Sequence, residues 1–352
     1  MLTRREIKNL LLPYSGADGV ARPLTQVAVD CLIWLTLVVA VAAPTPMWLK
    51  PFLAVLIGMW SARLFVLGHD ACHGSLTDSP PHNHLLGRIA FLPTLTPFSL
   101  WEVGHNIAHH GFNNLRGKDF VWTPLSRGEY DTLPLWRQRL ERLYRSPWGM
   151  GLYYLNEIWW RKLFFPNQKE MPSRRESFEA DSTLCAAFAA VWAAVLILGG
   201  AVTGQSILAL LVLGLVLPFL VWCHIMGFVV YVQHTHPSVR WYDSKEKWSA
   251  DQAFLTGTVH VQLWPLASRF LHHIMEHTAH HVDMSVPYDK LQKAQAQLEQ
   301  NLPAAVVVQP FTWNWFVRTT RECQLYDYEA QRWEQFNGAP AAPTLGGPDR
   351  HA

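Results

Sequence analysis

The chain has 352 residues, of which half are hydrophobic and only 16% are charged. Soluble proteins have roughly a quarter charged residues, so this chain is short of residues that face water. The net charge of +2 and the lack of a basic stripe interleaved with aromatic residues argue against a nucleic-acid partner. The five cysteines form no CxxC pair, so neither a disulfide framework nor a zinc ribbon is expected.

The first segment, residues 1–26, begins MLTRREIKNLLLPYSG. It contains basic residues, but its apolar stretch is too short for a signal peptide and no small-residue cleavage site follows. We therefore interpret it as a cytoplasmic amphipathic segment that precedes the membrane domain.

The apolar residues collect in long runs, and a helix that spans a membrane needs about 20 such residues. The connections PTPM and TGQS are short, so they predict two tight helical hairpins. Pro218 is tolerated in a membrane helix and can kink it. The four predicted passes are 27–43, 48–67, 184–202 and 207–232.

Two hairpins return all long polar segments to one side of the membrane. Basic residues precede the first pass in TRREIK and the third pass at 174–175, which makes this side cytoplasmic by the positive-inside rule. The sequence thus predicts an all-α membrane protein, with four transmembrane helices in two hairpins and a cytoplasmic helical cap. The membrane domain is expected over 27–338, followed by a disordered tail over 339–352.

Two further stretches, 85–101 and 254–271, are apolar but too short or too broken to span. Their tryptophans and prolines suit helices that lie at the membrane interface. Ordinary amphipathic helices of the cap are the alternative. The stretch 303–317 is expected to form a strand or a loop.

Eight of the seventeen histidines lie in three short motifs, HDACH (69–73), HNIAHH (105–110) and HTAHH (277–281). Residues four apart lie on one face of a helix, so His69 and His73 form a pair, as do His105 and His109. The third motif places its three histidines on one face. Neutral imidazole is the commonest ligand of borderline transition metals. The three motifs, predicted on the same side of the membrane, therefore indicate a metal site.

Eight imidazoles are too many for one tetrahedral zinc site and suit two metal ions. Iron fits best, because imidazole suits iron and the site lacks the Glu-x-x-His pairs of soluble carboxylate di-iron bundles. A histidine-lined metal transporter is disfavoured, because the motifs lie outside the apolar runs.

The three motifs, with YVQHTHP (231–237) after the fourth pass, resemble the histidine boxes of integral-membrane fatty acid desaturases. The resemblance covers residues 50–300 and is closest to the acyl-lipid omega-6 (Δ12) desaturase-like branch. It implies two non-haem iron ions. Carried over box by box, the expected ligands are His69, His73, His105, His109, His110, His234, His277, His280 and His281.

The ninth ligand could be either His234 or His236. The family has an aromatic residue three positions before the ligand, and Tyr231 stands there for His234. Pro237 disfavours the α conformation at His236, so that residue is expected just past the helix end. His234 is preferred because a rigid helix positions a ligand better than a loop does.

The resemblance implies an oxidoreductase that inserts a double bond into a fatty acyl chain with O2. The substrate could arrive as a lipid, a thioester or a carrier-bound chain. Without an HPGG motif or room for a fused haem domain, electrons are expected from a separate donor such as ferredoxin, docking near Arg161 and Lys162. The expected location is the bacterial inner membrane, with the active site on its cytoplasmic side. Hydroxylases, ketolases, epoxygenases and acetylenases share the boxes and remain the alternative.

The other histidines and acids receive weaker assignments. His82 and His84 are expected in a loop, and His272 and His273 on the helix of the third box. His224, inside the fourth pass, is either a partner of a ligand or a core histidine. Metal-bound imidazoles usually donate their other N–H to a carboxylate or carbonyl, and the acids that flank the boxes are the candidates unless water solvates them. These acids are Asp70, Glu102, Glu276 and Asp283.

Overall fold

The computed structural model describes residues 2–166, 171 and 175–342, and it is largely helical. The chain divides into two compact units, which are described separately. Unit 1 comprises residues 1–15, 107–150 and 228–352, and unit 2 comprises residues 16–106 and 151–227. Most of the predicted tail, residues 343–352, lies outside the described residues.

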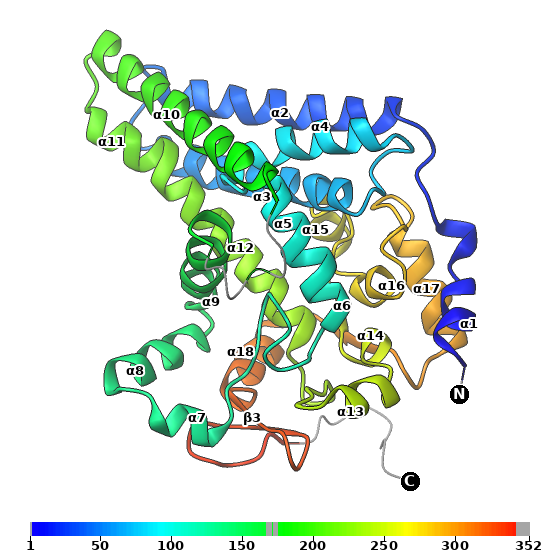
Figure 1. Cartoon of the computed structure of the whole chain (residues 1–352). Coiled ribbons are helices and arrows are strands. Elements are labelled where there is room, and N and C mark those ends of the chain that lie inside the picture. Colours follow the sequence, from blue (N-terminus) through cyan, green and yellow to red (C-terminus); the bar gives the residue numbers. More distant parts are fainter. Residues whose placement is uncertain (1, 167–170, 172–174, 343–352) are drawn as a thin grey trace. The chain divides into compact units, whose positions relative to one another are not determined.

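Unit 2 holds the long apolar helices (Figure 1). Among the described residues, four helices are long and apolar enough to cross a membrane: α2 (Ala21–Ala42), α3 (Lys50–Cys72), α10 (Ser177–Thr203) and the run Ile207–His234. Each contains or overlaps a predicted pass, so four apolar helices are confirmed. Unit 2 also contains α4 (Pro80–Phe91), a 3-10 turn (Leu92–Thr94), α5 (Phe98–Glu102) and η4 (Tyr154–Phe164).

The fourth long run is not a uniform α-helix. It consists of α11 (Ile207–Leu211), the π-helical stretch η5 (Val212–Val216) and α12 (Leu217–His234), which enters unit 1 at residue 228. Pro218 lacks the N–H that an α-helix would bond to Gly214, and the π stretch accommodates this loss. The run therefore changes its winding just before Pro218.

The long helices of unit 2 pack through tryptophan and small residues. Trp34 Nε1 of α2 donates to Ser61 Oγ of α3 at 3.0 Å, and the Arg63 guanidinium pairs with Asp30 at 2.9 Å. Gly58 allows α3 to approach α12, because a Cβ there would lie 2.6 Å from the Pro218 carbonyl oxygen.

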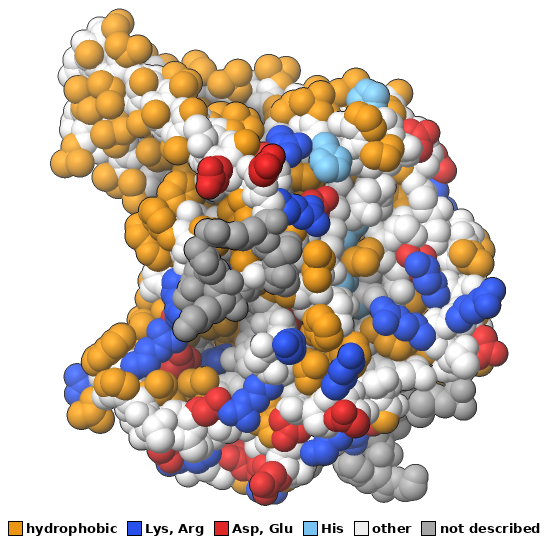
Figure 2. All heavy atoms as spheres, in the orientation of Figure 1, with side chains coloured by type: hydrophobic (Ala, Val, Ile, Leu, Met, Phe, Trp, Pro, Cys, Tyr) orange, Lys and Arg blue, Asp and Glu red, His pale blue; other side chains and the backbone are white. Residues whose placement is uncertain are grey.

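The outer faces of α2, α10 and α11 are apolar, and Figure 2 shows orange side chains covering them at the upper left. The exposed side chains include Leu32, Leu35, Val191, Leu198 and Leu208. An exposed apolar coat of this extent marks a surface that faces something other than water, here lipid.

Unit 1 is built from short elements. Its helices are α1 (Arg4–Asn9), η1 (Leu12–Tyr14), α6 (His110–Phe112), α7 (Arg127–Thr132), α8 (Leu135–Tyr144), α13 (Lys245–Ala250), α14 (Ala253–Thr256), α15 (Pro265–Phe270), α16 (His277–Val282), α17 (Leu291–Asn301) and α18 (Trp313–Glu322). The stretch η3 (Val103–His109) enters it from unit 2, and α9 (Met150–Tyr153) leaves it. Two small sheets complete it: β1 (Val259–Gln262) is parallel to β2 (Val307–Pro310), and β3 (Leu325–Asp327) is antiparallel to β4 (Arg332–Glu334).

The N-terminal segment belongs to the core of unit 1. Ile7 and Leu11 are fully buried in the same hydrophobic core as Ala279 and Val282 of α16. The same core includes Leu291, Ala294 and Leu298 of α17. The α1 segment therefore supports the helix that carries the third histidine box.

Several local predictions were wrong. The stretch 254–271 is not one helix, because the alternating sequence Val-His-Val forms β1 with both valines buried. His272 and His273 do not belong to the helix of the third box. Their φ angles of 49° and 59° lie in the left-handed region, which interrupts the helix before α16 begins at His277.

His82 and His84 lie in α4 and not in a loop, because prolines at its first turn start the helix early. The stretch 303–317 contains strand β2 and also the start of α18, where Thr312 caps the first turn. At the chain end, the Ala341 N–H bonds the Trp333 carbonyl at 2.9 Å, so the described part of the predicted tail extends the β4 region.

Candidate metal centre

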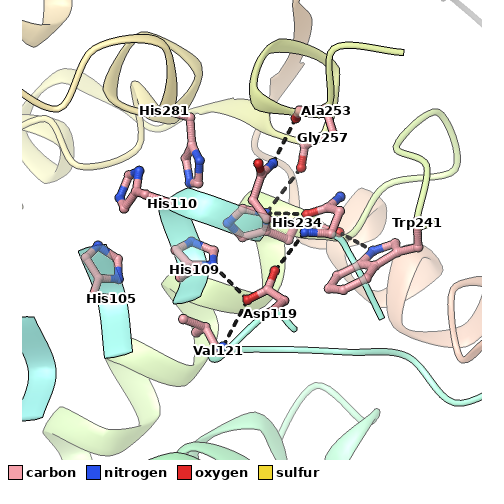
Figure 3. Close-up of polar contacts among 12 residues, drawn as sticks. His105, His109, His110, Asp119, Val121, His234, Trp241, Ala253, Gly257 and His281 are labelled. Atoms are coloured by element: carbon pink, nitrogen blue, oxygen red, sulfur yellow. Dashed lines mark hydrogen bonds and ion pairs between the residues drawn. The ribbon is translucent and has the colours of Figure 1, made fainter. Parts of the chain in front are cut away.

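Four histidines meet in the interior of unit 1. His109, His234, His277 and His281 are all buried, and each offers one ring nitrogen within 4.8 Å of the others. His277 Nε2 lies 3.0 Å from His234 Nε2 and 3.0 Å from His281 Nε2. Figure 3 shows the rings of His109, His234 and His281 turned toward one another. These side chains come from three separate elements, the end of η3, the end of α12, and α16.

The hydrogen bonds of His234 determine which nitrogen faces the cluster. His234 Nδ1 donates to the Gly257 carbonyl oxygen at 3.2 Å and contacts Asn114 Oδ1 at 3.0 Å. A carbonyl oxygen only accepts, so Nδ1 carries the proton. His234 Nε2 therefore presents a lone pair toward His277, as a metal ligand requires.

His109 is oriented by a carboxylate. Its Nδ1 lies 2.8 Å from Asp119 Oδ1. Asp119 also accepts the backbone N–H groups of Asn114 at 2.8 Å and Val121 at 3.0 Å (Figure 3). Burial raises the pKa of Asp119, but His109 and the Val121 N–H outweigh this effect and hold that pKa below its usual value. An ionised Asp119 fixes the His109 ring, as carboxylates do behind metal-bound imidazoles.

The donor set fits a divalent transition metal. Burial, together with the neighbouring His277 and His109, lowers the pKa of His281 well below its usual value. Neutral imidazoles with converging Nε2 atoms cannot all satisfy one another, because each carries a single N–H. A cation at their centre satisfies these lone pairs, and imidazole nitrogen is compatible with non-haem iron.

The remaining box histidine pair of unit 1 consists of His110 and His280. Their Nε2 atoms lie 3.0 Å apart and both side chains are buried. The third box therefore divides: His280 turns toward His110, while His277 and His281 join the group of four. The helix α16 does hold all three, as the spacing predicts.

Unit 2 brings together His69, His73 and His105. His69 Nε2 lies 2.8 Å from His105 Nε2 and 3.4 Å from His73 Nε2. The Trp101 ring stacks on His105 with centroids 4.8 Å apart. The Asn106 side chain donates to the Cys72 carbonyl at 2.8 Å, which ties the second box to the end of α3.

The second box is not the regular helix that its spacing predicts. Val103–His109 is π-helical, with i→i+5 bonds that hold more residues per turn. Residues four apart no longer lie one above the other. His109 accordingly joins the four-histidine group of unit 1, while His105 pairs with His69 in unit 2.

The four acids that flank the histidine boxes have different hydrogen-bond and ion-pair partners. Asp70 Oδ1 lies 3.3 Å from His69 Nδ1, so of the two alternatives for this acid the structure favours the histidine partner. Glu102 instead pairs with Arg175, and Glu276 bonds His273, which is not in a box. Asp283 accepts from Ser15 and pairs with Lys8. Asp119 and Asn114 were missed, because nothing in their sequence spacing relates them to the boxes.

His224 and His236, in and just after the fourth pass, belong to neither group of candidate metal ligands. His236 is buried, and its Nδ1 accepts the Ser238 N–H at 3.1 Å. His224 is half-buried in α12 and packs against Gly151, where a Cβ would lie 2.7 Å from the His224 Cα.

Several known enzymes are similar to this chain in sequence. The sn-1 oleoyl-lipid 12-desaturase of Picosynechococcus is 29% identical over 82% of this chain and 80% of its own length. The enzyme of the same name from Synechocystis is 28% identical over 81% and 78%. The chloroplastic omega-6 fatty acid desaturase of Glycine max is 27% identical over 81% of this chain and 64% of its own. The family model described as fatty acid desaturase matches residues 46–313, and the chain therefore belongs to the fatty acid desaturase family.

Proposed function

We propose that this oxidoreductase introduces a double bond at position 12 of an oleoyl chain carried by a membrane lipid. The observation that carries the proposal is the buried group of four histidines with converging ring nitrogens. The relatives named sn-1 oleoyl-lipid 12-desaturase support the choice of substrate and position.

We infer that the enzyme holds two iron ions. His109, His234, His277 and His281 would bind one of them. The resemblance of the three motifs to the family's histidine boxes implies that the other five box histidines would bind the second. These five are His69, His73, His105, His110 and His280.

Bound iron supplies the one-electron chemistry that removes hydrogen from an unactivated methylene, which acid–base side chains do not achieve. The balance is one CH2–CH2 unit, O2, two electrons and two protons, giving CH=CH and two waters. The protein residues orient the ligands: Asp119 holds His109, and the Gly257 carbonyl fixes the tautomer of His234. In unit 2, stacked Trp101 shields His105 from water.

We further propose the topology expected from the sequence, with two hairpins and both termini in the cytoplasm of a bacterium. Lys50 is the one basic residue at the first connection, and it is buried with its ammonium donating to the Ala43 carbonyl at 2.8 Å. A C-terminal reporter that is active only in the cytoplasm tests this orientation. Activity of a periplasmic reporter there would contradict it.

The electrons would come from a separate donor such as ferredoxin. Arg161 and Lys162 are proposed to contribute to its docking surface, beside the exposed Trp160. Purified enzyme should desaturate only when O2, a donor and its reductase are all present.

Lipid analysis of a bacterium that expresses the chain tests the whole proposal. Gas chromatography with mass spectrometry should show a new double bond at position 12 of oleoyl chains. A variant with His281→Ala serves as the inactive control. If the lipids gain only hydroxyl or keto groups, the desaturase assignment is wrong and the hydroxylase or ketolase alternative takes its place.

A further inference from the structure

Helix α16 carries the three histidines of the third box, but it has few hydrogen bonds of its own. It has six residues, and its N-cap residue, Glu276, makes no capping hydrogen bond with its side chain. A helix of this length is not stable alone, because few hydrogen bonds offset the cost of nucleation. The position of α16 therefore depends on the elements around it.

The ring of His281 depends on α16 more than the rings of His109 and His234 depend on their own helices. The Nδ1 atoms of His109 and His234 each contact a residue from another part of unit 1. Within the described part of the chain, His281 Nδ1 has no hydrogen-bond partner. The placement of this ring therefore relies on the backbone of α16 and on the packing of the imidazoles.

One buried side chain bonds the backbone of α16 directly. Gln295, on α17, is 1% exposed, and its Oε1 accepts the Ala279 N–H at 2.9 Å. Ala279 is the third residue of α16, and the first four N–H groups of a helix have no partner inside it. An N-cap side chain usually accepts one of them. Here the acceptor comes instead from a second helix, 16 residues further along the chain.

The orientation of the Gln295 amide is fixed at its other end. Gln295 Nε2 donates to Glu299 Oε1 at 2.9 Å, one turn further along α17. A backbone N–H only donates and an ionised carboxylate only accepts, so the amide oxygen must face Ala279 and the NH2 must face Glu299. Reversal of the amide would break both hydrogen bonds at once.

Glu299 is held in turn by strand β1. Its Oε1 contacts His260 Nδ1 at 2.5 Å. Burial raises the pKa of Glu299, but the hydrogen bonds from His260 and Gln295 outweigh this effect and keep that pKa below its usual value. The three side chains thus form one line of hydrogen bonds that runs from β1 through α17 to α16.

A second hydrogen bond joins α16 to the segment just before β1. Thr258 Oγ1 donates to Thr278 Oγ1 at 2.9 Å, and both residues are fully buried. This bond joins two side chains, whereas Gln295 bonds the backbone of α16 itself. Gln295 therefore constrains the stretch of backbone that carries the third-box ligands.

We propose that Gln295 is a positioning residue for the metal centre: it holds the backbone of α16, and with it the imidazole of His281, where a metal ion can bind. Glu299 and His260 contribute by holding the Gln295 amide. This inference rests on the proposed iron site. Gln295 acts through the N–H of Ala279.

Gln295→Met removes both hydrogen bonds of the amide and keeps an unbranched side chain of similar length. Hydrogen exchange of the peptide 277–282 is measured on the full-length enzyme in detergent, with and without added Fe²⁺. Loss of the acceptor of a buried N–H predicts that α16 opens roughly 5- to 150-fold more. Gln300→Met is the matched control, because Gln300 is exposed on the same helix, and it should leave the exchange unchanged. Equal exchange in the two variants would overturn the proposal.

Titration of the same samples with Fe²⁺ separates positioning from support of the helix alone. Gln295→Met should weaken Fe²⁺ binding about 10-fold, the lower end of the effect of groups behind metal ligands. Faster exchange with full Fe²⁺ affinity would show that Gln295 supports α16 without positioning a ligand, and the proposal would be wrong. Wild-type enzyme that binds Fe²⁺ but desaturates no lipid would contradict the proposed function and leave this inference intact.

Exchange of the two end groups provides a rescue test. Gln295→Glu keeps an acceptor for the Ala279 N–H but places a second carboxylate against Glu299, so α16 should open more and bind Fe²⁺ less tightly. The double variant Gln295→Glu with Glu299→Gln restores a donor between the two positions, while an acceptor still faces Ala279. Both the protection of 277–282 and the Fe²⁺ affinity should return toward the wild-type values. A double variant no better than Gln295→Glu alone would show that this line of hydrogen bonds does not hold α16.

Discussion

Leu11→Ala should loosen the helix that carries the third histidine box, although Leu11 lies far from that box in sequence. The Leu11 side chain is 0% exposed and shares a core with Ala279 and Val282 of α16. Two polar contacts from the N-terminal segment reach Asp283, which caps the C-terminal end of α16. Ser15 Oγ donates to Asp283 Oδ2 at 2.7 Å, and the Lys8 ammonium lies 3.2 Å from Asp283 Oδ1.

The magnitude follows from burial and from the length of α16. Truncating a fully buried leucine costs about 2–5 kcal/mol. A helix of six residues is not stable alone, so α16 depends on the neighbours that cover it. If the free energy of local opening of α16 falls by about 2 kcal/mol, the lower end of this range, the open state of α16 should be populated roughly 30-fold more.

Hydrogen exchange of the peptide that contains residues 277–282, followed by mass spectrometry, measures this opening directly. Iron per chain should fall in the same variant. Leu12→Ala is the matched control, because the neighbouring leucine is 58% exposed and should change stability by about 0.5 kcal/mol or less. Equal exchange in the two variants would show that the N-terminal segment does not support α16. The segment lies outside residues 46–313, which match the family model.

Three further predictions concern the metal centre and the electron donor. Asp119→Asn should weaken iron binding by about 10–100-fold while the protein stays folded, measured by iron titration and circular dichroism; unchanged affinity would contradict the orienting role. His234→Ala should lose iron and activity, whereas His236→Ala should retain more iron with activity reduced by about 10–100-fold; iron lost only in the second variant would reverse the assignment. Arg161→Glu with Lys162→Glu should raise the KM for an acidic donor protein, more at low salt, while activity with a small chemical reductant stays unchanged.

The coarse organisation could be predicted because it depends on local patterns. Apolar runs of about 20 residues specify the four long helices. The i, i+4 spacing of His69 and His73 puts both side chains on one helix face, and their Nε2 atoms lie 3.4 Å apart. That the candidate metal centre consists of histidines likewise follows from the boxes alone.

The finer features depend on contacts between distant segments. The π-helical winding of Val103–His109 separates His105 from His109, and no spacing rule signals it. Strand β1 forms because β2 lies about 50 residues later to pair with it, through Val259 and Val307. A short segment with alternating valines near a proline is compatible with helix or strand, and tertiary pairing decides.

The orientation of two histidines of the four-histidine group, His109 and His234, depends on one asparagine that no histidine box includes. Asn114 has a φ of 60°, a left-handed conformation that asparagine tolerates better than most residues. Its backbone N–H bonds Asp119, which holds His109, and its side-chain oxygen lies 3.0 Å from His234 Nδ1. Its side-chain NH2 donates to the Arg240 carbonyl at 2.9 Å, which prevents the amide from rotating away. The boxes thus supply the ring nitrogens, but contacts from the loop between Asn114 and Asp119 help to determine which nitrogen of His109 and His234 faces the four-histidine group.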